Sequence, residues 1–576
     1  MGNIPQQFQK DFSSGMVTNI NENLKPESSI RLAMNLECDH EIGSLVSRLG
    51  SAQVGSQLEN NKTILGLHDF NYGTTSNKLL AVVNNSGDTQ AVIENVESQG
   101  AITGWTTQTA NTKTRFVTFL DSVLVINGVD AETSYNGTTV ITTGGAFDLA
   151  NIPSSNTVDI GIEWRDRVYL TGDTAEPARL YYSTLPYNQA VAWDSNGNAT
   201  FTAAATDIIT STAHGLSNGT LLILTTSGTL PAGLSTGTPY YVISAATDTF
   251  SVSIKVGGAA VDITGTGTGT HTWHTWQFID IEPEDGNGPI TGLGKVPGYL
   301  LIFKERNMKR WNFDNAFPET LMNIGTSSHE SIVNAAGLCA FYSASNQSNK
   351  GFYLTNGGRP VPISHMRARN IKKWVDAIPQ SYDANVAGWG TENYFLWSIG
   401  DVTVDGIDYT NVVVKWNRIF DQWSVRSYPS EFRVFSSYVD TSGNNTIVGG
   451  DDDGNIIQID KPATYTDYPS STPINWEVIL HQEDFGFNQI KEISDSIVVR
   501  SEGIEDAVFR VTLDNNPLDK VVNIGTVDKR VKELKLKQVL RANDFQFGLK
   551  GSNLGQRATI KEIEIPDIDV IPENYG

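Results

Sequence analysis

The chain has 576 residues, of which 39% are hydrophobic and 18% charged, and its formal net charge is -23. This length predicts two to four domains, and the hydrophobic fraction excludes a disordered chain. The acidity argues against tight binding of nucleic acids, because that affinity comes from Lys and Arg side chains that displace counterions from phosphates. It is compatible with a wall along which DNA slides, and equally with an acidic surface that keeps the protein soluble.

The N-terminal segment is polar and has no basic start followed by an apolar stretch. No uninterrupted apolar run of about 18 residues follows it. We therefore expect a protein made in a cytoplasm, not secreted by the usual route, that inserts no segment of its own into a membrane. Cys38 and Cys339 do not form a C-x-x-C pair, so we expect two small core side chains.

Residues 1–60 show no regular apolar period, and we interpret them as an extended N-terminal arm with one or two short strands. Three carboxylates near the end of this arm, Glu37, Asp39 and Glu41, are interpreted as solvated.

From about residue 63 a loose unit recurs, in which a short apolar strand, a turn of Gly, Asn or Asp, and a second aliphatic strand follow one another. Seven such units are centred on residues 64–83, 115–128, 161–183, 290–311, 337–355, 394–425 and 446–459. Their spacing of about 40–60 residues is typical of propeller blades, which stack radially because one small sheet cannot bury both its faces. A large β-sandwich or two barrels would show strand periodicity without the longer repeat.

The predicted fold is thus all-β, with a discontinuous β-propeller of about seven blade-like units over 61–195 and 279–470. Residues 196–278 interrupt the repeat with small, mostly uncharged residues. We expect them to form a small β-module inserted into a loop, where insertions cost least. Period-2 alternation over 471–576 predicts a C-terminal β-sandwich-like domain. Nowhere does the sequence predict an amphipathic helix longer than two or three turns.

Motifs for phosphate-binding loops, α/β-hydrolase elbows and zinc proteases are missing from the sequence. His271 and His274 could ligate a metal from one face of a helix, but in a strand they point to opposite faces. We interpret them as polar residues at a module junction. We predict no enzyme, with no catalytic residues, no cofactor and no metal.

Two acidic clusters were candidates for chemistry. Residues 451–455, Asp-Asp-Asp-Gly-Asn, resemble part of a calcium loop but lack its later glutamate, so a tight hairpin turn explains them better. Glu282, Glu284 and Asp285 could supply the carboxylate pair of a glycosidase. A proline and a glycine among them indicate an exposed turn instead.

Several segments resemble a known family, the hub or nozzle β-propeller proteins of tailed-bacteriophage tails. The resemblance covers about residues 1–470 and is carried by 36–50, 164–170, 178–183 with 192–193, 286–311, and the inserted 214–271. It implies a structural virion protein, made in the host cytoplasm and located in the tail. It also implies a homohexameric ring below portal and adaptor proteins, which conducts double-stranded DNA during ejection without binding it tightly and docks tail fibre or spike proteins. No catalytic residues come with the resemblance.

Two alternatives stay open. One is a carbohydrate-binding propeller for adhesion to the host surface. In it, sugars would stack on the side chains of Trp389, Trp397, Trp416 and Trp423. Tryptophans at strand spacing, however, more often fill the blade core. The other is a polysaccharide-cleaving enzyme. A hexameric mass would favour the conduit, and a monomer or trimer would favour the alternatives.

Overall fold

The structure is a computed structural model. It describes residues 6–19, 25–26, 28–38, 42–72, 76–88, 91–96, 100–105, 108–149, 152, 157–186, 189–193, 198–236, 238–255, 257–275, 278–281, 288–312, 318–365, 369–439, 443–469, 472–485, 489–493, 496–514, 520–527, 531–535, 539–553 and 555–571. The chain divides into two compact units. The first comprises Met1–Ile64, Glu330–Asn356 and Pro360–Gly576, and the second comprises Leu65–His329 and Gly357–Arg359.

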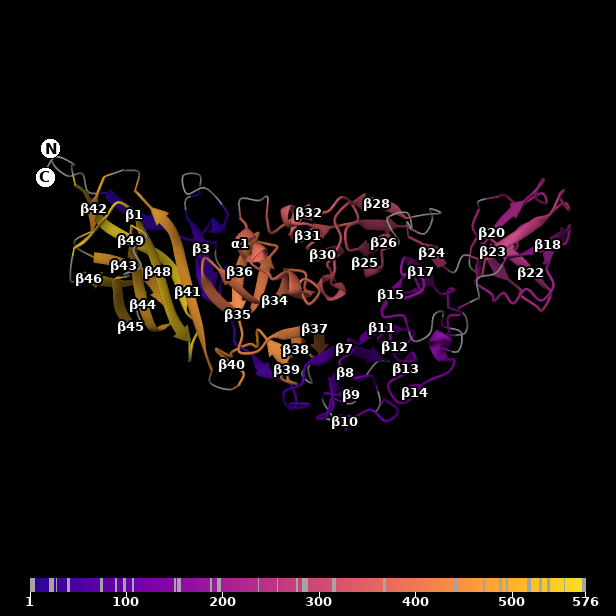
Figure 1. The fold of residues 1–576 in the computed structure, drawn as a ribbon, viewed down its shortest axis with the longest axis horizontal. Coiled ribbons are helices and arrows are strands. Elements are labelled where there is room, and N and C mark those ends of the chain that lie inside the picture. Colours follow the sequence, from indigo (N-terminus) through magenta and orange to yellow (C-terminus); the bar gives the residue numbers. More distant parts are fainter. Residues whose placement is uncertain are drawn as a thin grey trace. The chain divides into compact units, whose positions relative to one another are not determined.

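The described part of the second unit contains four four-stranded sheets of propeller-blade size (Figure 1). They are formed by β7 (Ile64–Tyr72), β8 (Ser76–Asn84), β9 (Ala91–Asn95) and β10 (Gly100–Ala101); by β11 (Arg115–Phe119), β12 (Ser122–Ile126), β13 (Thr133–Tyr135) and β14 (Val140–Ile141); by β15 (Ile160–Trp164), β16 (Arg167–Thr171), β17 (Arg179–Tyr182) and β24 (Phe278–Asp280); and by β25 (Ile290–Val296), β26 (Tyr299–Lys304), β27 (Met308–Trp311) and β28 (Glu319–Met322).

Among the described residues of the first unit, three further groups of four neighbouring strands have the form of a blade. They are formed by β29 (Val333–Ala335), β30 (Leu338–Ser343), β31 (Gly351–Thr355) and β32 (Val361–Pro362); by β33 (Ala387–Gly390), β34 (Tyr394–Val404), β35 (Ile407–Asn417) and β36 (Gln422–Ser427); and by β37 (Phe432–Val439), β38 (Asn445–Asp451), β39 (Ile456–Ile459) and β6 (Ala52–Gln53). One of these groups, β33–β36, is part of an 11-stranded sheet. Together with the four sheets of the second unit, the groups match the seven units expected from the sequence, and the fold is a β-propeller.

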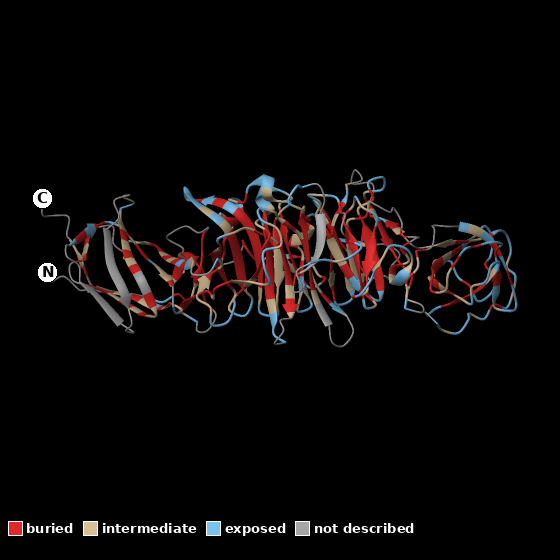
Figure 2. Ribbon diagram, turned by 90° about the horizontal axis from the view of Figure 1, so that it is seen from below, coloured by how far each residue is buried: buried red, intermediate tan, exposed pale blue. Residues whose placement is uncertain are grey.

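Local sequence accounts for several hairpins of the blades. The turns Leu120-Asp121, Arg165-Asp166, Ala336-Gly337 and Asp405-Gly406 each join two strands through two residues, and both residues of each turn have positive φ. Two-residue turns with this geometry match the right-handed twist of the paired strands. Short apolar strands follow the first two of these turns, and every residue of β12 and of β16 is buried. Figure 2 shows the same concentration of buried positions in the strands.

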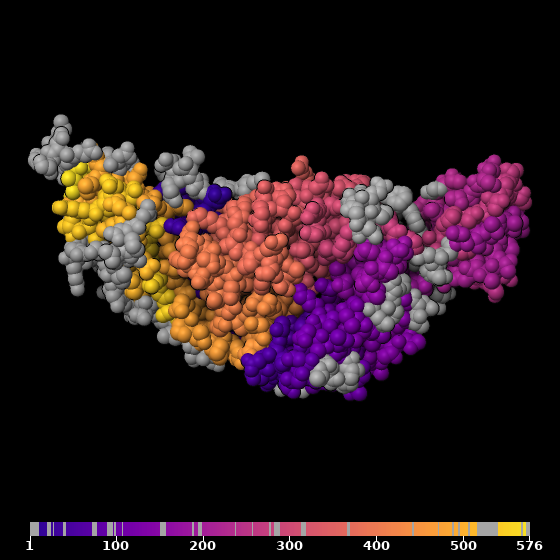
Figure 3. Space-filling view, in the orientation of Figure 1, coloured from indigo at the N-terminus to yellow at the C-terminus, as the bar shows by residue number. Residues whose placement is uncertain are grey.

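The inserted module lies in the chain between β17 and β24, the third and fourth strands of one blade. It is a closed barrel in the order β18-β19-β22-β21-β20-β23. Its strands are β18 (Asn198–Ala204), β19 (Ile208–Thr210), β20 (Leu221–Thr226), β21 (Tyr240–Ile243), β22 (Thr249–Ser253) and β23 (His271–Thr275). The barrel has its own core around Phe201, Leu224, Val242 and Trp273, and its residues form a continuous mass in Figure 3.

The C-terminal sandwich consists of two sheets that N-terminal strands complete. In the first sheet, β3 (Ser29–Met34) lies between β36 of a blade and β41 (Thr472–Glu483), which continues to β48 (Phe545–Asn553), β44 (Ile504–Leu513) and β45 (Lys520–Val527). The second contains β4 (Leu36–Glu37), β5 (Leu45–Ser47), β49 (Thr559–Val570), β42 (Lys491–Ile493) and β47 (Leu540–Ala542), with β1 (Gln6–Lys10), β43 (Ser496–Glu502) and β46 (Val531–Lys535) paired beside this path.

The N-terminal arm is therefore richer in strands than the sequence indicated. The structure describes β1, β2 (Gly15–Met16), β3, β4, β5 and β6 where one or two short strands were expected. The expectation was wrong because strands this short carry little periodic signal, and most of them obtain hydrogen bonds from distant segments. Strand β1 pairs with β49, β3 with β36 and β41, β5 with β49, and β6 with β39.

Helix is scarce in the described chain, and α1 (Lys372–Asp376) has five residues. Among the described helices, none is long and apolar enough to cross a membrane.

Candidate functional site

The junction between the blade β33–β36 and the sandwich contains a group of buried charges. It comprises Glu37 at the end of β4, Lys415 in β35 and Arg426 in β36. The Nζ atom of Lys415 lies 2.8 Å from Oε2 of Glu37, and Arg426 donates to Oε1 of the same carboxylate. The side chains of Glu37 and Arg426 are 3% and 0% exposed.

A second set of contacts extends this group. Arg426 also pairs with Asp460 at 3.0 Å. Arg48, which follows β5, donates to Oδ1 of Asp467 at 2.8 Å and to Oδ1 of Asn35 at 2.8 Å. We refer to Glu37, Arg48, Lys415, Arg426, Asp460 and Asp467 as the buried ion cluster. In it three cations face three carboxylates, so that each buried charge has an opposite partner, as burial requires.

The electrostatics of the cluster favour the charged forms. Burial lowers the pKa of Arg426, but the carboxylates of Asp460 and Glu37 outweigh it and hold the pKa well above its usual value. Burial likewise acts against the charge of Arg48, and Asp467 reverses the effect and raises its pKa. Arg48 and Arg426 thus remain charged, and the cluster to which they belong joins N-terminal residues to a blade.

The N-terminal segment also completes the blade β37–β39. Strand β6 pairs with β39 through Gln53↔Ile457 and Ala52↔Gln458. The turn between β38 and β39 has Gly454 at φ +80°, and a Cβ atom there would lie 1.8 Å from the carbonyl oxygen of Glu59. Only glycine allows this approach of the two segments.

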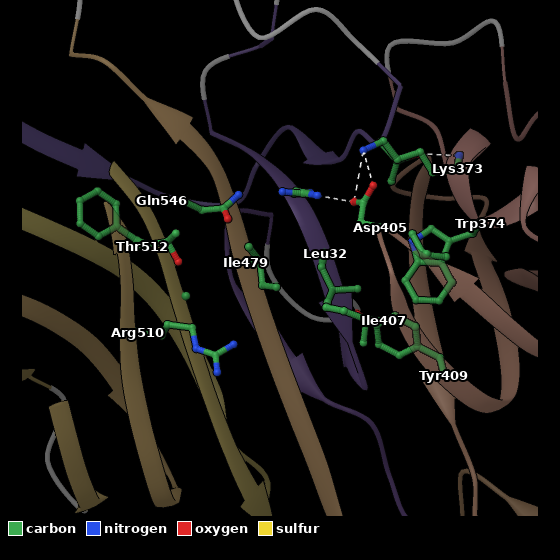
Figure 4. A pocket seen from close by; sticks show the side chains of 15 residues that line it. Leu32, Lys373, Trp374, Asp405, Ile407, Tyr409, Ile479, Arg510, Thr512 and Gln546 are labelled. Carbon is green, nitrogen blue, oxygen red and sulfur yellow. Dashed lines mark hydrogen bonds and ion pairs between the residues drawn. The ribbon is translucent and has the colours of Figure 1, made fainter. Parts of the chain in front are cut away.

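A pocket of about 390 Å³ opens where the blade β33–β36 meets the sandwich, and we call it the junction pocket; no residue of the buried ion cluster is in its described lining. Its walls come from β3, from α1 with the hairpin β34–β35, and from the sandwich strands β41, β44 and β48. Figure 4 shows Lys373 reaching Asp405 from the helix side, with Arg510 and Gln546 on the sandwich side.

The charges of the junction pocket are organised around one carboxylate. Asp405 accepts from Nζ of Lys373 at 2.9 and 3.2 Å, and also from the guanidinium of Arg31. Burial raises the pKa of Asp405, but the hydrogen bonds from Arg31 and Lys373 outweigh it, and the net pKa is lowered. Asp405 is therefore ionised at neutral pH. All three side chains keep about a third or more of their surface exposed.

Residues singled out from the sequence lie elsewhere. His271 and His274 are in β23, where their spacing places them on opposite faces. His271 contacts the hydroxyl of Thr226 at 2.8 Å, and His274 contacts that of Thr225 at 2.9 Å. No group of His, Cys, Asp and Glu within the described chain could hold a metal ion.

The acidic run 451–455 forms the turn between β38 and β39. Oδ1 of Asp451 accepts from the backbone N–H of Asp453 at 3.0 Å and of Asn455 at 2.7 Å. The interpretation as a tight turn is confirmed. The carboxylates Glu282, Glu284 and Asp285 lie outside the described residues, as do Asp39 and Glu41.

Four tryptophans were weighed as sugar platforms or blade core. Trp397, Trp416 and Trp423 are at most 3% exposed and lie in the main hydrophobic core of the first unit, and Trp389 is partly buried. Their strand spacing identified them correctly as core. Cys38 and Cys339 are buried thiols, as expected.

The interpretation of Glu37 as solvated was wrong. Its carboxylate is buried because Lys415 and Arg426 neutralise it. The residues of the junction pocket were also missed by the sequence argument. They come from five stretches of the chain, 18–32, 373–409, 479, 510–512 and 546–548, and no local motif connects these stretches.

Comparisons with known proteins give matches among solved structures only. No protein-family model matches the sequence, and no curated protein does. Among solved structures, the chain is similar to YCF48 bound to D1 peptide (TM-score 0.34, 8% identity, 74% of this chain and 98% of that chain) and to BamB from Moraxella catarrhalis (0.31, 11%, 72% and 99%). A chain of the mitotic checkpoint complex is also similar (0.36, 7%, 73% and 94%). Likenesses of this strength say nothing about what the chain binds.

Proposed function

We propose that this chain is a structural subunit of a bacteriophage tail, a hub or nozzle. It assembles as a ring, conducts the genome during ejection and offers surfaces for other tail proteins, among them portal or adaptor proteins and fibres or spikes. It acts without catalysis. The family resemblance of the sequence motivates this proposal, and a single feature of the fold supports it best.

That feature is the continuous sheet at the junction. Strand β3 pairs in parallel with β36 at Met34↔Val425, and in antiparallel with β41 through four registered pairs from Ile30↔Leu480 to Met34↔Glu477. A blade and the C-terminal sandwich therefore share one hydrogen-bonded sheet instead of a flexible linker. Inter-domain motion is the default where domains meet through small polar interfaces. A joint of this kind suits a subunit that must hold its shape within an assembly.

The sugar-binding alternative finds less support. Three of the four tryptophans that could have stacked on a sugar are buried in the core. Buried rings stabilise blade packing and leave no face for a ligand.

The mass of the full chain in solution tests the proposal. Native mass spectrometry should give six copies, and electron micrographs of the same sample should show rings with a central opening. A chain that stays monomeric or trimeric at every accessible concentration would contradict the conduit and favour an adhesin.

A further inference from the structure

The inserted barrel has a pocket of about 690 Å³ along β18 (Figure 1), which we call the barrel pocket. Besides part of β18, its described lining consists of the end of β19 with the two residues after it, and of residues 266 and 269–271, just before and at the start of β23. All of these residues belong to the barrel itself. A pocket of this volume is within the range of ligand sites.

The barrel pocket is neutral, although the chain as a whole has a formal net charge of -23. Its described lining contains no Asp, Glu, Lys or Arg. The imidazole of His271 already uses both of its nitrogens. Nε2 donates to the carbonyl oxygen of Thr266 at 3.1 Å, and Nδ1 lies 2.8 Å from the hydroxyl of Thr226. A lining without charge gives an ion no partner, so the ligand that it fits is neutral.

Threonine hydroxyls are the polar groups that the barrel pocket offers. In β18, the exposed Thr200 and Thr202 alternate with the buried Phe201 and Ala203, as the two faces of a strand require. Thr202 pairs in register with Thr210 of β19. The exposed threonines of the described lining are Thr200, Thr202, Thr210, Thr212, Thr266 and Thr270. Within the described chain, the hydroxyls of these six residues make no internal hydrogen bond, so they are available to a ligand.

The strands that carry these hydroxyls are fixed by a buried serine. Ser211, between Thr210 and Thr212, donates to the carbonyl oxygen of Thr200 at 3.0 Å. The same hydroxyl accepts from Nε1 of Trp273 at 2.9 Å. Polar groups on a fixed backbone lose little conformational entropy when a ligand binds.

The loop before β23 is held in a similar way. The hydrogen bond from His271 fixes the backbone at Thr266. Between Thr266 and Thr270, Gly267 and Gly269 have φ values of +69° and +85°, which glycine adopts at little cost. Both threonines of this loop thus face a ligand from a defined backbone.

We propose that the barrel pocket binds a short neutral saccharide through its threonine hydroxyls. Each hydroxyl can donate one hydrogen bond and accept others, as each hydroxyl of a sugar can. Threonine methyl groups also provide van der Waals contact with the C–H groups of a sugar ring. An apolar ligand finds little surface, because Phe201 is only 4% exposed. A peptide that adds as a strand finds no free edge, because the barrel is closed.

This site is distinct from the tryptophan platforms considered for the propeller, since no tryptophan is in its described lining. The inference goes beyond the tail proposal and concerns the barrel alone. It would hold even if the chain formed no ring.

Saturation-transfer NMR on the full chain tests the proposal. The neutral probes are maltotriose and triacetylchitotriose, and their charged matches are trigalacturonate and the deacetylated, cationic chitotriose. We expect at least one neutral trisaccharide to bind saturably with a Kd of about 1 mM, because hydrogen bonds between neutral groups each contribute little against water. The charged trisaccharides should bind about tenfold more weakly or worse, because the pocket leaves their charges without partners.

Two variants locate the binding. Thr202→Val and Thr210→Val each replace a hydroxyl by a methyl group and keep a residue that favours strands. Each should weaken the neutral trisaccharide by about threefold, and the double variant by about tenfold. The control Thr236→Val removes an exposed threonine hydroxyl of the same barrel outside the described lining, and it should change nothing.

The comparison of neutral and charged trisaccharides on the unmodified chain stands even if a variant fails to fold. Equal binding of neutral and charged probes, unchanged binding in the double variant, or no saturable binding up to about 20 mM would overturn the inference. So would a neutral peptide, acetyl-Gly-Thr-Gly-Thr-Gly-amide, that binds where the saccharides do not.

Discussion

Glu37 is the residue on which the N-terminal segment and the blade β33–β36 converge. It is buried with Lys415 and Arg426, whose positions in the sequence are 378 and 389 residues away. A buried ion pair contributes little net stability compared with apolar packing, but removing one partner is costly because it strands the other charge. We therefore expect the buried ion cluster to define where the N-terminal strands join the blade.

Replacing Glu37 tests this expectation. Glu37→Gln keeps the shape of the side chain and leaves Lys415 and Arg426 without their shared counter-charge. We expect the free energy of unfolding to fall by about 3–5 kcal/mol. Chemical denaturation followed by tryptophan fluorescence measures the change.

A matched control is Glu502→Gln. Glu502 pairs with Lys561 at 3.6 Å, and both side chains are more than 40% exposed. Exposed pairs contribute about 0–1 kcal/mol, so this variant should unfold almost as the unmodified chain does. If the two variants lose the same stability, the buried cluster has no special role.

At this scale, the burial of a residue can be predicted when the neighbours that determine it are close in the sequence. The prediction fails when those neighbours belong to distant strands. Trp397, Trp416 and Trp423 were placed in the core because strand alternation around them is visible in the sequence. Glu37 was placed in solvent because its partners belong to distant strands. Any method that reads short windows will misplace such a residue.

At the scale of elements, strands joined by tight turns were the predictable part. The seven apolar pairs of strands coincide with blade sheets, since the hairpin pairing is local and the turns carry Asp, Asn or Gly. The pairing of β6 with β39 and of β3 with both β36 and β41 could not be predicted. Two residues such as Ala52 and Gln53 form a strand only because a neighbouring edge supplies their hydrogen bonds.

The inserted barrel offers a test at this scale. Its limits in the structure, β18 to β23, leave β24 in the blade, where Leu180 pairs with Ile279 and Tyr181 with Phe278. Joining Trp193 to Phe278 by a short Gly/Ser linker should give a soluble chain that melts cooperatively. The barrel core is separate from that of the blade, apart from contributions of Leu221 and Tyr241. Losing the buried Leu221 side chain should cost about 2–5 kcal/mol, by analogy with Leu→Ala changes in cores.

The control deletion extends through Ile281 and so removes β24 as well. It should aggregate or melt without cooperativity, because the outer edge of β17 then loses its partner strand. Circular dichroism melts of the two proteins decide the question. If both deletions aggregate alike, the barrel is part of the blade and not a separable module.

At the scale of the whole molecule, the fold could be predicted from the repeated strand units and the charge from the composition, whereas the joint between propeller and sandwich could not be predicted. Acidity constrains what the chain can do with DNA. Tight binding needs several lysines or arginines free to replace counterions. Within the described chain, many of the basic side chains pair with carboxylates, among them Arg115 with Asp159, Arg179 with Asp280 and Lys295 with Glu163. Such pairs leave little positive charge for phosphates.

We therefore expect the free chain not to bind duplex DNA tightly. Fluorescence anisotropy with a labelled duplex at about 50 mM salt is the most demanding condition, since screening is weakest there and electrostatic affinity highest. We predict no complex with a Kd of about 1 µM or below, because non-specific binding of this strength needs a basic surface. A basic DNA-binding protein titrated with the same duplex shows that the label reports binding.

A repulsive or neutral wall lets a polyanion slide past with short residence, as a conduit requires. A micromolar or tighter complex that dissociates at about 200 mM salt would mean that basic groups gather on one surface despite the net charge, and would indicate a clamp on packaged DNA instead of a conduit.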